Sequence, residues 1–486
     1  MTGHIIAFLA FTSLAFLSCA PKVPQTKEHI VTDTNLTTFI NQNGNWIGSS
    51  HISENTTLDF NVSFSVKDNA VSGTMSIPAQ NAYDVPLDDI ALHEGTFSFI
   101  LKPPSMPKMM WAKYEFPNAT SSDSLEGTLK QMGKTFPTTL NKGANPKANR
   151  PQTPQPPFPY TSKEVTYTTN DNATIAGTLT IPEEDGPHPV VILITGSGSQ
   201  DRDETIFEHK PFWVIADHLS RNGIAVLRVD DRGIGGSTGI RDDLTSFVFA
   251  EDVGSGLDFL KAQPEVDSQK MGLIGHSEGG LIGPIVASQR SDVAFLVLLA
   301  GTGVNGLEVL TRQNVDLFRT KGMNEEQEQK LKEHFTKSMS PNGTREDLLE
   351  LIQLQFNISD IQASPEIIEQ HADSALKAKN QPWMQTFLNT EPSEYLNQIT
   401  VPVLALNGTK DLQVAHDQNL PSIEQALKNG GNQHVTIHTL DGLNHMFQMA
   451  EVGTVEEYAQ IEETFNPQAL NIISDWISEI VSQEMP

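Results

Sequence analysis

Residues 189–301 alternate between short apolar runs and amphipathic segments, and this alternation constrains the fold more than any other feature of the sequence. The run 189–196 is almost continuously apolar, as is typical of a strand buried on both faces of a parallel sheet. Alternation of this kind predicts an α/β fold with a doubly wound, mostly parallel sheet. We expect strands at residues 224–233, 270–277, 294–301, 401–408 and 434–440, helices at 211–223, 247–263, 279–290 and 466–481, and an entry hairpin at 165–169 and 173–181.

Residues 302–398 interrupt this alternation, because they contain no strand pattern. Two segments within them, 324–339 and 345–356, have the composition of helices. We interpret the interruption as a helical cap inserted into the α/β domain.

A different pattern precedes the α/β region. Period-two alternation over residues 38–141, punctuated by Gly, Asn and Asp, predicts a small all-β domain, either a barrel or a sandwich. Its opening resembles the G-x-W start of lipocalin-like barrels, in which Trp46 is either a plug of the barrel or a platform for a ligand. Six prolines between Pro146 and Pro159 predict an extended linker or surface strap over residues 142–162, and the α/β domain is expected to begin at residue 163.

The N-terminus has the pattern of an export signal. Residues 5–17 are largely apolar but too few for a spanning helix, which needs about 20 residues. The only cysteine, Cys19, follows directly, and the whole resembles a bacterial lipoprotein signal in which residues 1–18 are removed and Cys19 is lipidated. Residues 19–37 would then be a tether, and the protein would be lipid-anchored in the cell envelope, on the periplasmic side or at the cell surface. An ordinary cleaved signal with an incidental cysteine is the alternative.

The charge balance restricts the partners. With 32 Lys and Arg against 60 Asp and Glu, the net charge is −28, which argues against nucleic acid or an anionic membrane surface as the main partner. A small-molecule substrate fits this balance. A single cysteine excludes a disulfide scaffold or a zinc finger.

A G-x-S-x-G pattern stands between a predicted strand and a predicted helix, at residues 275–279. A serine on such a tight turn takes a strained backbone, and the glycines avoid collisions with neighbouring strands. The turn lifts the Ser277 hydroxyl above the sheet, where the helix N-terminus supplies N–H groups to an oxyanion. Ser277 is therefore the candidate nucleophile.

Serine needs a base, and the base needs an acid to fix its tautomer. His445 lies on the loop between the last predicted strand and the final helix, which returns to the carboxyl edge of the sheet. Asp411 lies just beyond the strand 401–408, and the order Ser277, Asp411, His445 matches that of serine hydrolases built on α/β sheets. Asp441, four residues before His445, is the rival acid.

The oxyanion hole is expected to take one N–H from Glu278 and the other from the loop after the first parallel strand. Ser197 is the candidate donor on that loop, with Gly198 as the alternative. The charged neighbours Asp201, Arg202 and Asp203 either shape this loop through ion pairs or touch substrate. We interpret Arg232, on the loop after the next strand, as a residue with a structural role.

Four motifs together are similar to those of a known family. They are G-S-G-S-Q-D-R-D-E at residues 196–204, D-R-G-I-G-G-S at 231–237, G-H-S-E-G-G at 275–280 and L-N-H-M-F-Q at 443–448. On these motifs residues 163–486 resemble an α/β-hydrolase, of the bacterial esterase and serine-aminopeptidase-like branch.

The resemblance implies hydrolysis of carboxylic esters, with short acyl chains, through an acyl-enzyme on Ser277, and it implies no cofactor and no metal. It also implies that a β-rich module can precede the hydrolase. A peptidase or amidase would use the same machinery, so that reading stays open. A non-catalytic surface-binding lipoprotein is the third alternative, since the β domain and the anchor suit adhesion.

Overall fold

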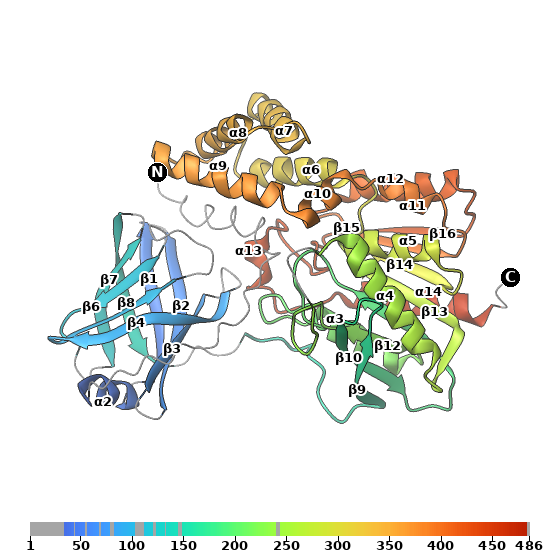
Figure 1. Cartoon of the computed structure of the whole chain (residues 1–486), viewed down its shortest axis with the longest axis horizontal. Helices are drawn as coiled ribbons and strands as arrows, with labels where there is room; N and C mark the ends of the chain where they lie inside the picture. The colour runs from blue at the N-terminus through green and yellow to red at the C-terminus, as the bar shows by residue number, and fades with distance from the viewer. Residues whose placement is uncertain are drawn as a thin grey trace. The chain divides into compact units, whose positions relative to one another are not determined.

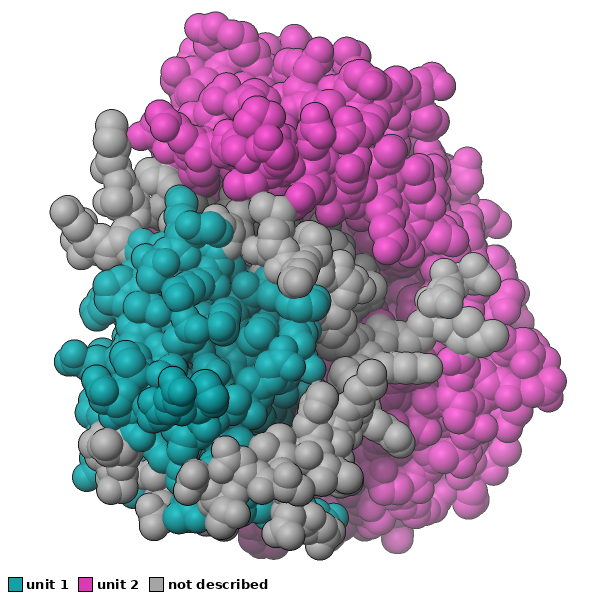
Figure 2. Space-filling model, turned by 60° about the vertical axis from the view of Figure 1, so that its left-hand side comes forward, with its two compact units in different colours: residues 1–14, 19–149 teal, residues 15–18, 150–486 magenta. Residues whose placement is uncertain are grey.

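The computed structural model describes residues 34–483 apart from short gaps at residues 43, 54–55, 68–69, 78–81, 103–110, 120–122, 132, 144–147 and 240–243. The predicted signal, residues 1–18, and the predicted lipidation site, Cys19, lie outside the described residues. Between Asn149 and Arg150 the chain divides into two compact units (Figure 2). None of the described helices is both long and apolar enough to cross a lipid bilayer.

The first unit is a closed antiparallel barrel in which each strand pairs with the next and β8 pairs with β1. Its inward side chains form one apolar cluster that includes Trp46, fully buried and stacked near Phe39. Trp46 is therefore a plug of the barrel. The prediction of a small all-β domain is confirmed, as a barrel. The strands are β1 (Asn45–Ser53), β2 (Thr56–Lys67), β3 (Ala70–Ile77), β4 (Ala82–His93), β5 (Thr96–Leu101), β6 (Ala112–Phe116), β7 (Ser124–Gln131) and β8 (Lys134–Lys142).

A helix precedes the barrel strands, and the sequence pattern did not indicate it. Helix α2 (Thr34–Gln42) places Leu36, Phe39 and Ile40 in the apolar cluster of the barrel. Spacings of three and four residues put these side chains on one helix face, which is buried. The expected tether over residues 19–37 is thus corrected, because residues 34–37 belong to a helix that packs on the barrel.

The second unit is built on an eight-stranded sheet of order β16-β15-β14-β13-β11-β12-β10-β9 (Figure 1). Strands β11 to β16 pair in parallel, whereas β9 and β10 form the antiparallel hairpin at one edge. The predicted α/β fold is confirmed. The strands are β9 (Tyr160–Thr168), β10 (Thr174–Pro182), β11 (His188–Ile194), β12 (Ala225–Val229), β13 (Val266–His276), β14 (Phe295–Leu299), β15 (Val403–Gly408) and β16 (Val435–Leu440).

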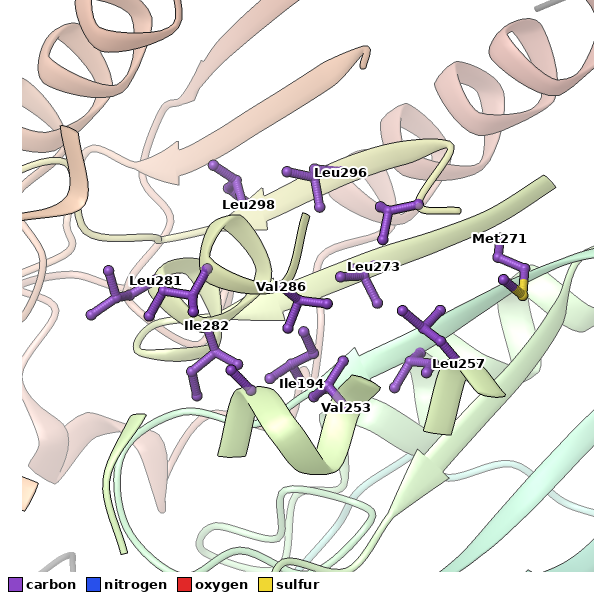
Figure 3. Close-up of a cluster of buried hydrophobic side chains, with 14 of the residues drawn as sticks. Ile194, Val253, Leu257, Met271, Leu273, Leu281, Ile282, Val286, Leu296 and Leu298 are labelled. Carbon is purple, nitrogen blue, oxygen red and sulfur yellow. The ribbon is translucent and has the colours of Figure 1, made fainter. Parts of the chain in front are cut away.

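Helices cover both faces of this sheet, which explains why its strands are apolar on both sides. Along β11, Val190, Ile192 and Ile194 belong to one core cluster, and Val191 and Leu193 belong to the other. The first cluster is shared with α4 (Ser246–Lys261), α5 (Gly279–Gln289) and α12 (His416–Asn429), and Figure 3 shows part of it around Leu273 and Ile282. The second is shared with α3 (Pro211–Arg221) and α14 (Pro467–Ser482).

Helices alone fill the insertion between β14 and β15. They are α6 (Gly306–Arg319), α7 (Glu325–Met339), α8 (Arg345–Ile358), α9 (Pro365–Lys379), α10 (Pro382–Asn389) and α11 (Pro392–Leu396). Several begin with side-chain caps, such as the reciprocal bonds at Asn324 and Thr344, which explains why their starts are sharp. A short helix, α13 (Val455–Tyr458), follows β16.

Part of the proline-rich segment is bound to the second unit. Tyr160–Ser162, expected in the linker, are the first residues of β9. Arg150 donates to the backbone oxygens of Phe207, Ala459 and Ile461. The second unit therefore begins ten residues before its first strand, earlier than residue 163.

Candidate active site

Ser277 lies on the turn between β13 and α5, with φ of 53°. This left-handed backbone costs a non-glycine residue about 1–3 kcal/mol and is concentrated at functional sites. A Cβ on Gly275 would lie 2.0 Å from the Gly279 carbonyl oxygen, and a Cβ on Gly279 would lie 2.2 Å from that of Ile194. Both glycines of the motif are thus required by close backbone packing.

His445 and Asp411 are brought together. His445 Nδ1 lies 2.8 Å from Asp411 Oδ2, and both side chains are buried. The other Asp411 oxygen accepts the backbone N–H groups of Gln413 and Val414, which hold the carboxylate in place. Asp441 instead accepts the hydroxyl of Thr409. The aspartate paired with the histidine is therefore Asp411.

The loop after β11 closely approaches Ser277. A Cβ on Gly196 would lie 3.1 Å from the Ser277 Cβ, which is closer than an ordinary van der Waals contact. The Gly196 N–H donates to Glu204 Oε1 at 2.7 Å, and Gly198 has φ of 103°, which favours glycine. The Ser197 side chain lies close enough to the carboxyl of Glu278 to lower its pKa. The two predicted oxyanion residues, Ser197 and Glu278, are thus neighbours beside Ser277.

The side chain of Glu278 has a role that the sequence did not reveal. Its carboxyl accepts the Ser246 hydroxyl at 2.6 Å and the Trp383 indole N–H at 2.9 Å. Burial raises the pKa of Glu278, and the Ser246, Trp383 and Ser197 hydrogen bonds oppose that rise. Because Trp383 lies on α10, this carboxyl ties the cap to the turn that carries Ser277.

Ion pairs shape the loops around the site. Arg202 pairs with Asp230 and Glu164, and Asp203 pairs with Arg228. Asp201 accepts the backbone N–H groups of Asp203 and Thr205 within its own loop. Arg232 pairs with Asp171 and Asp252, on the neighbouring chain segments. These contacts agree with the prediction that the charged residues of both loops shape the loops through ion pairs.

A small cavity of about 30 Å³ lies under the loop of Gly196 and is lined by Asp231, Glu278 and Tyr167, among others. Asp231 accepts the Thr195 hydroxyl and the Gln200 N–H. Burial raises its pKa to about 8, and the nearby carboxylates of Glu278 and Glu204 add to the rise. Asp231 is therefore an acid that holds its proton near neutral pH. Among the described residues, no group of three His, Cys, Asp or Glu side chains is arranged to hold a metal ion.

Comparison with known proteins gives a consistent picture. The family model "Serine aminopeptidase, S33" matches residues 210–451. Esterase EstD of Thermotoga maritima is 27% identical over 290 residues, which are 57% of this chain and 59% of that protein. An uncharacterized protein of Escherichia coli is 30% identical over 118 residues, which are 24% of this chain and 38% of that protein. This chain thus spans less than two thirds of either relative.

Two solved structures show weaker similarity. The Pyrococcus furiosus esterase Pf2001 is 17% identical, with a TM-score of 0.43, over 71% of this chain and 100% of that one. The α/β hydrolase GrgF from Penicillium sp. sh18 is 18% identical, with a TM-score of 0.42, over 66% of this chain and 100% of that one.

The sheet order, the strained serine turn and the matching family model all indicate the same fold. The second unit therefore has an α/β-hydrolase fold, and its residues 210–451 match the serine aminopeptidase family.

Proposed function

We propose that this chain is a serine carboxylesterase that hydrolyses esters of short acyl chains through an acyl-enzyme on Ser277. The observation that carries the proposal is the buried hydrogen bond of 2.8 Å between His445 Nδ1 and Asp411 Oδ2. An aspartate on Nδ1 fixes the tautomer that leaves Nε2 free to accept a proton, as a serine nucleophile requires.

In the proposed reaction the Ser277 oxygen attacks the ester carbonyl while His445 Nε2 takes the hydroxyl proton. The backbone N–H groups of Ser197 and Glu278 stabilise the oxyanion; one such donor contributes on the order of a hundredfold in rate. The tetrahedral intermediate collapses, the bond to the alcohol breaks, and the alcohol leaves with the proton from His445. Water then attacks the acyl-enzyme, again through His445, and releases the carboxylic acid.

The test is the Ser277→Ala variant of the full chain with p-nitrophenyl acetate. We expect turnover to fall by at least about a thousandfold, since the acyl-enzyme cannot form. Ser288→Ala, on the helix that follows the turn, is the matched control and keeps full turnover, because its hydroxyl only bonds to the Ile285 carbonyl. A fluorophosphonate probe labels the wild type and Ser288→Ala but not Ser277→Ala. Wild-type turnover in Ser277→Ala contradicts the proposal.

An amide substrate is the second candidate, and the name of the matching family model favours it. The same acyl transfer cleaves amides when His445 protonates a leaving amine. A panel of short acyl esters and aminoacyl amides separates the two: higher kcat/KM on the esters supports the carboxylesterase, and higher kcat/KM on the amides replaces it with a peptidase.

We also propose that Cys19 carries the lipid anchor that places the protein in the cell envelope. The short apolar run before it and the polar segment after it support this proposal. Cells expressing Cys19→Ala should release the protein from the membrane fraction, whereas the wild type stays there; release of both would refute the anchor.

A further inference from the structure

His276, the residue before the proposed nucleophile, lies between two loops that the reaction needs. It is 6% exposed. Its Nδ1 lies 2.9 Å from Glu204 Oε1, on the loop after β11, and its Nε2 lies 3.0 Å from the backbone oxygen of His445. The two imidazole rings are close, with 4.8 Å between their centroids.

Both neighbours of the His276 ring accept hydrogen bonds. A backbone carbonyl can only accept, and Glu204 Oε1 already accepts the Gly196 N–H at 2.7 Å, as a carboxylate does. A neutral imidazole has one N–H and one bare nitrogen, so it would leave one of these contacts without a proton. An imidazolium donates to both.

His209 gives an internal comparison, because it is also buried but has different neighbours. Its Nε2 lies 2.9 Å from the Tyr458 carbonyl oxygen, and its Nδ1 lies 2.8 Å from the Thr464 hydroxyl. A hydroxyl can donate as well as accept, so one ring proton satisfies both contacts. Burial lowers the pKa of His209 to about 4.

We propose that His276 is a positioning residue: as an imidazolium it ties the loop of the oxyanion donor to the backbone of the base, and so holds both in place around Ser277. Glu204 holds Gly196, the residue before the oxyanion donor Ser197, and the His445 carbonyl belongs to the base itself. The expected effect of His276 on kcat rests on the proposed serine mechanism. The positive charge on His276 does not depend on that mechanism.

The surrounding charges support the imidazolium. Burial by itself lowers the pKa of His276, but the Glu204 carboxylate and its hydrogen bond, the His445 carbonyl and the Asp411 carboxylate together outweigh burial and raise it. These groups come from the loops after β11, β15 and β16, and the His445 imidazole also lies against the ring.

The charge on His276 is tested by NMR of the full chain with ¹⁵N-labelled histidine at neutral pH. We expect two protonated ring nitrogens for His276 and one for His209, with the signals assigned from the spectra of His276→Gln and His209→Gln. A His276 ring with one bare nitrogen overturns the inference. Because the NMR measurement needs no turnover, its result does not depend on whether the protein is an esterase.

The positioning role is tested by kinetics. His276→Gln and Glu204→Gln should each lower kcat by about 10- to 100-fold, since small displacements of reacting groups have effects of this size, while KM stays nearly constant. His188→Gln is the matched control, because His188 is also 6% exposed. It bonds to the Glu184 carbonyl and lies at the amino end of β11, whereas His276 lies at the carboxyl end of β13. His188→Gln should keep the kcat of the wild type. A loss of less than about threefold in His276→Gln overturns the role.

A pH profile separates positioning from a general loss of structure. A histidine whose pKa is raised on folding keeps its contacts at low pH and loses them as the pH rises through the folded pKa. The wild type should therefore lose kcat on the alkaline side as His276 gives up its proton, and this alkaline limb should be absent in His276→Gln. The acid limb, from protonation of the base His445, should remain in both. An unchanged alkaline limb in His276→Gln contradicts the inference.

Discussion

At the scale of single residues, two aspartates compete for the role of the acid, and the sequence could only rank them. Asp411 bonds to His445 Nδ1, whereas Asp441 bonds to the Thr409 hydroxyl. Asp411→Asn should lower kcat by about 10³- to 10⁴-fold, because an amide favours the wrong histidine tautomer. Asp441→Asn, the matched control, should leave kcat nearly unchanged. Hydrolysis of p-nitrophenyl acetate measures both, and equal losses in the two variants would contradict the assignment.

Asp231 allows a prediction about pH. Its pKa is raised by burial to about 8, so the folded chain keeps a proton that the unfolded chain releases above its ordinary pKa. The contribution of Asp231 to the free energy of unfolding therefore falls as the pH rises from the ordinary pKa of an aspartate to the pKa of Asp231 in the folded chain. Asp231→Asn removes that loss and can still bond to Gln200 and Thr195.

The measurement is thermal unfolding of the wild type and Asp231→Asn in mildly acidic and mildly alkaline buffer. The Tm of Asp231→Asn relative to the wild type should rise between the two buffers. A difference in Tm that is constant with pH would show that Asp231 is ionised throughout.

Residues whose role follows from their position in a motif could be predicted from the sequence. Roles that depend on contacts with residues distant in the chain could not. The glycines and the serine of residues 275–279 could be predicted because a strand-to-helix turn has only one geometry. The two acceptors around His276, and the contact of Glu278 with Trp383, join segments far apart in the chain. No spacing in a single sequence encodes such contacts.

At the scale of elements, the packing of α5 against the sheet depends on the absence of a side chain at its first residue. A Cβ on Gly279 would lie 2.2 Å from the backbone oxygen of Ile194 on β11, where nothing flexible can give way. Gly279→Ala should destabilise the chain by about 1–3 kcal/mol, as overpacking does. It should also lower kcat, because it moves the turn of Ser277.

Gly254→Ala in α4 is the control for that variant. A Cβ there would meet only the end of the Arg290 side chain, at 3.7 Å. Replacing a helical glycine by alanine then stabilises by about 0.5–1 kcal/mol. Denaturant unfolding of the two variants should give shifts of opposite sign, and a shift of the same sign and size in both would contradict the packing argument.

The elements of the sheet were predictable because a strand buried on both faces has an unmistakable apolar run, as β11 and β14 do. Helix α2 was not, because its buried face consists of only Leu36, Phe39 and Ile40 in a nine-residue segment. So short a pattern cannot be distinguished from a tether until the barrel that buries it is known.

At the scale of the whole molecule, each unit has its own apolar core, and the boundary between them lies inside the proline-rich segment. Proline content predicted an extended segment but could not show that residues 150–152 bind the second unit. Besides the bonds of Arg150, the Gln152 side chain accepts the N–H groups of Thr464 and Phe465 and donates to the Phe465 carbonyl. Arg150 and Gln152 are thus bound to the second unit rather than part of a free linker.

This boundary predicts how the second unit behaves when separated. A fragment of residues 148–486 should keep the kcat of the full chain, because it holds both of its core clusters and the residues of the proposed site. A fragment of residues 160–486 begins at the same β9 but lacks the bonds of Arg150 and Gln152. Net values of about 0.5–1.5 kcal/mol for each lost hydrogen bond predict a Tm lower by several degrees.

The two fragments are compared by thermal unfolding and by p-nitrophenyl acetate hydrolysis, with Arg150→Ala in the longer fragment as a third sample. Since Arg150 bonds to the carbonyl of Phe207, just beyond Glu204 in the loop after β11, its loss should lower kcat as well as Tm. Lys330→Ala is the control, because its pair with Glu326 is exposed and such pairs contribute about 0–1 kcal/mol. Equal Tm values for the two fragments would mean that residues 150–159 are only a linker, and that the second unit begins at β9.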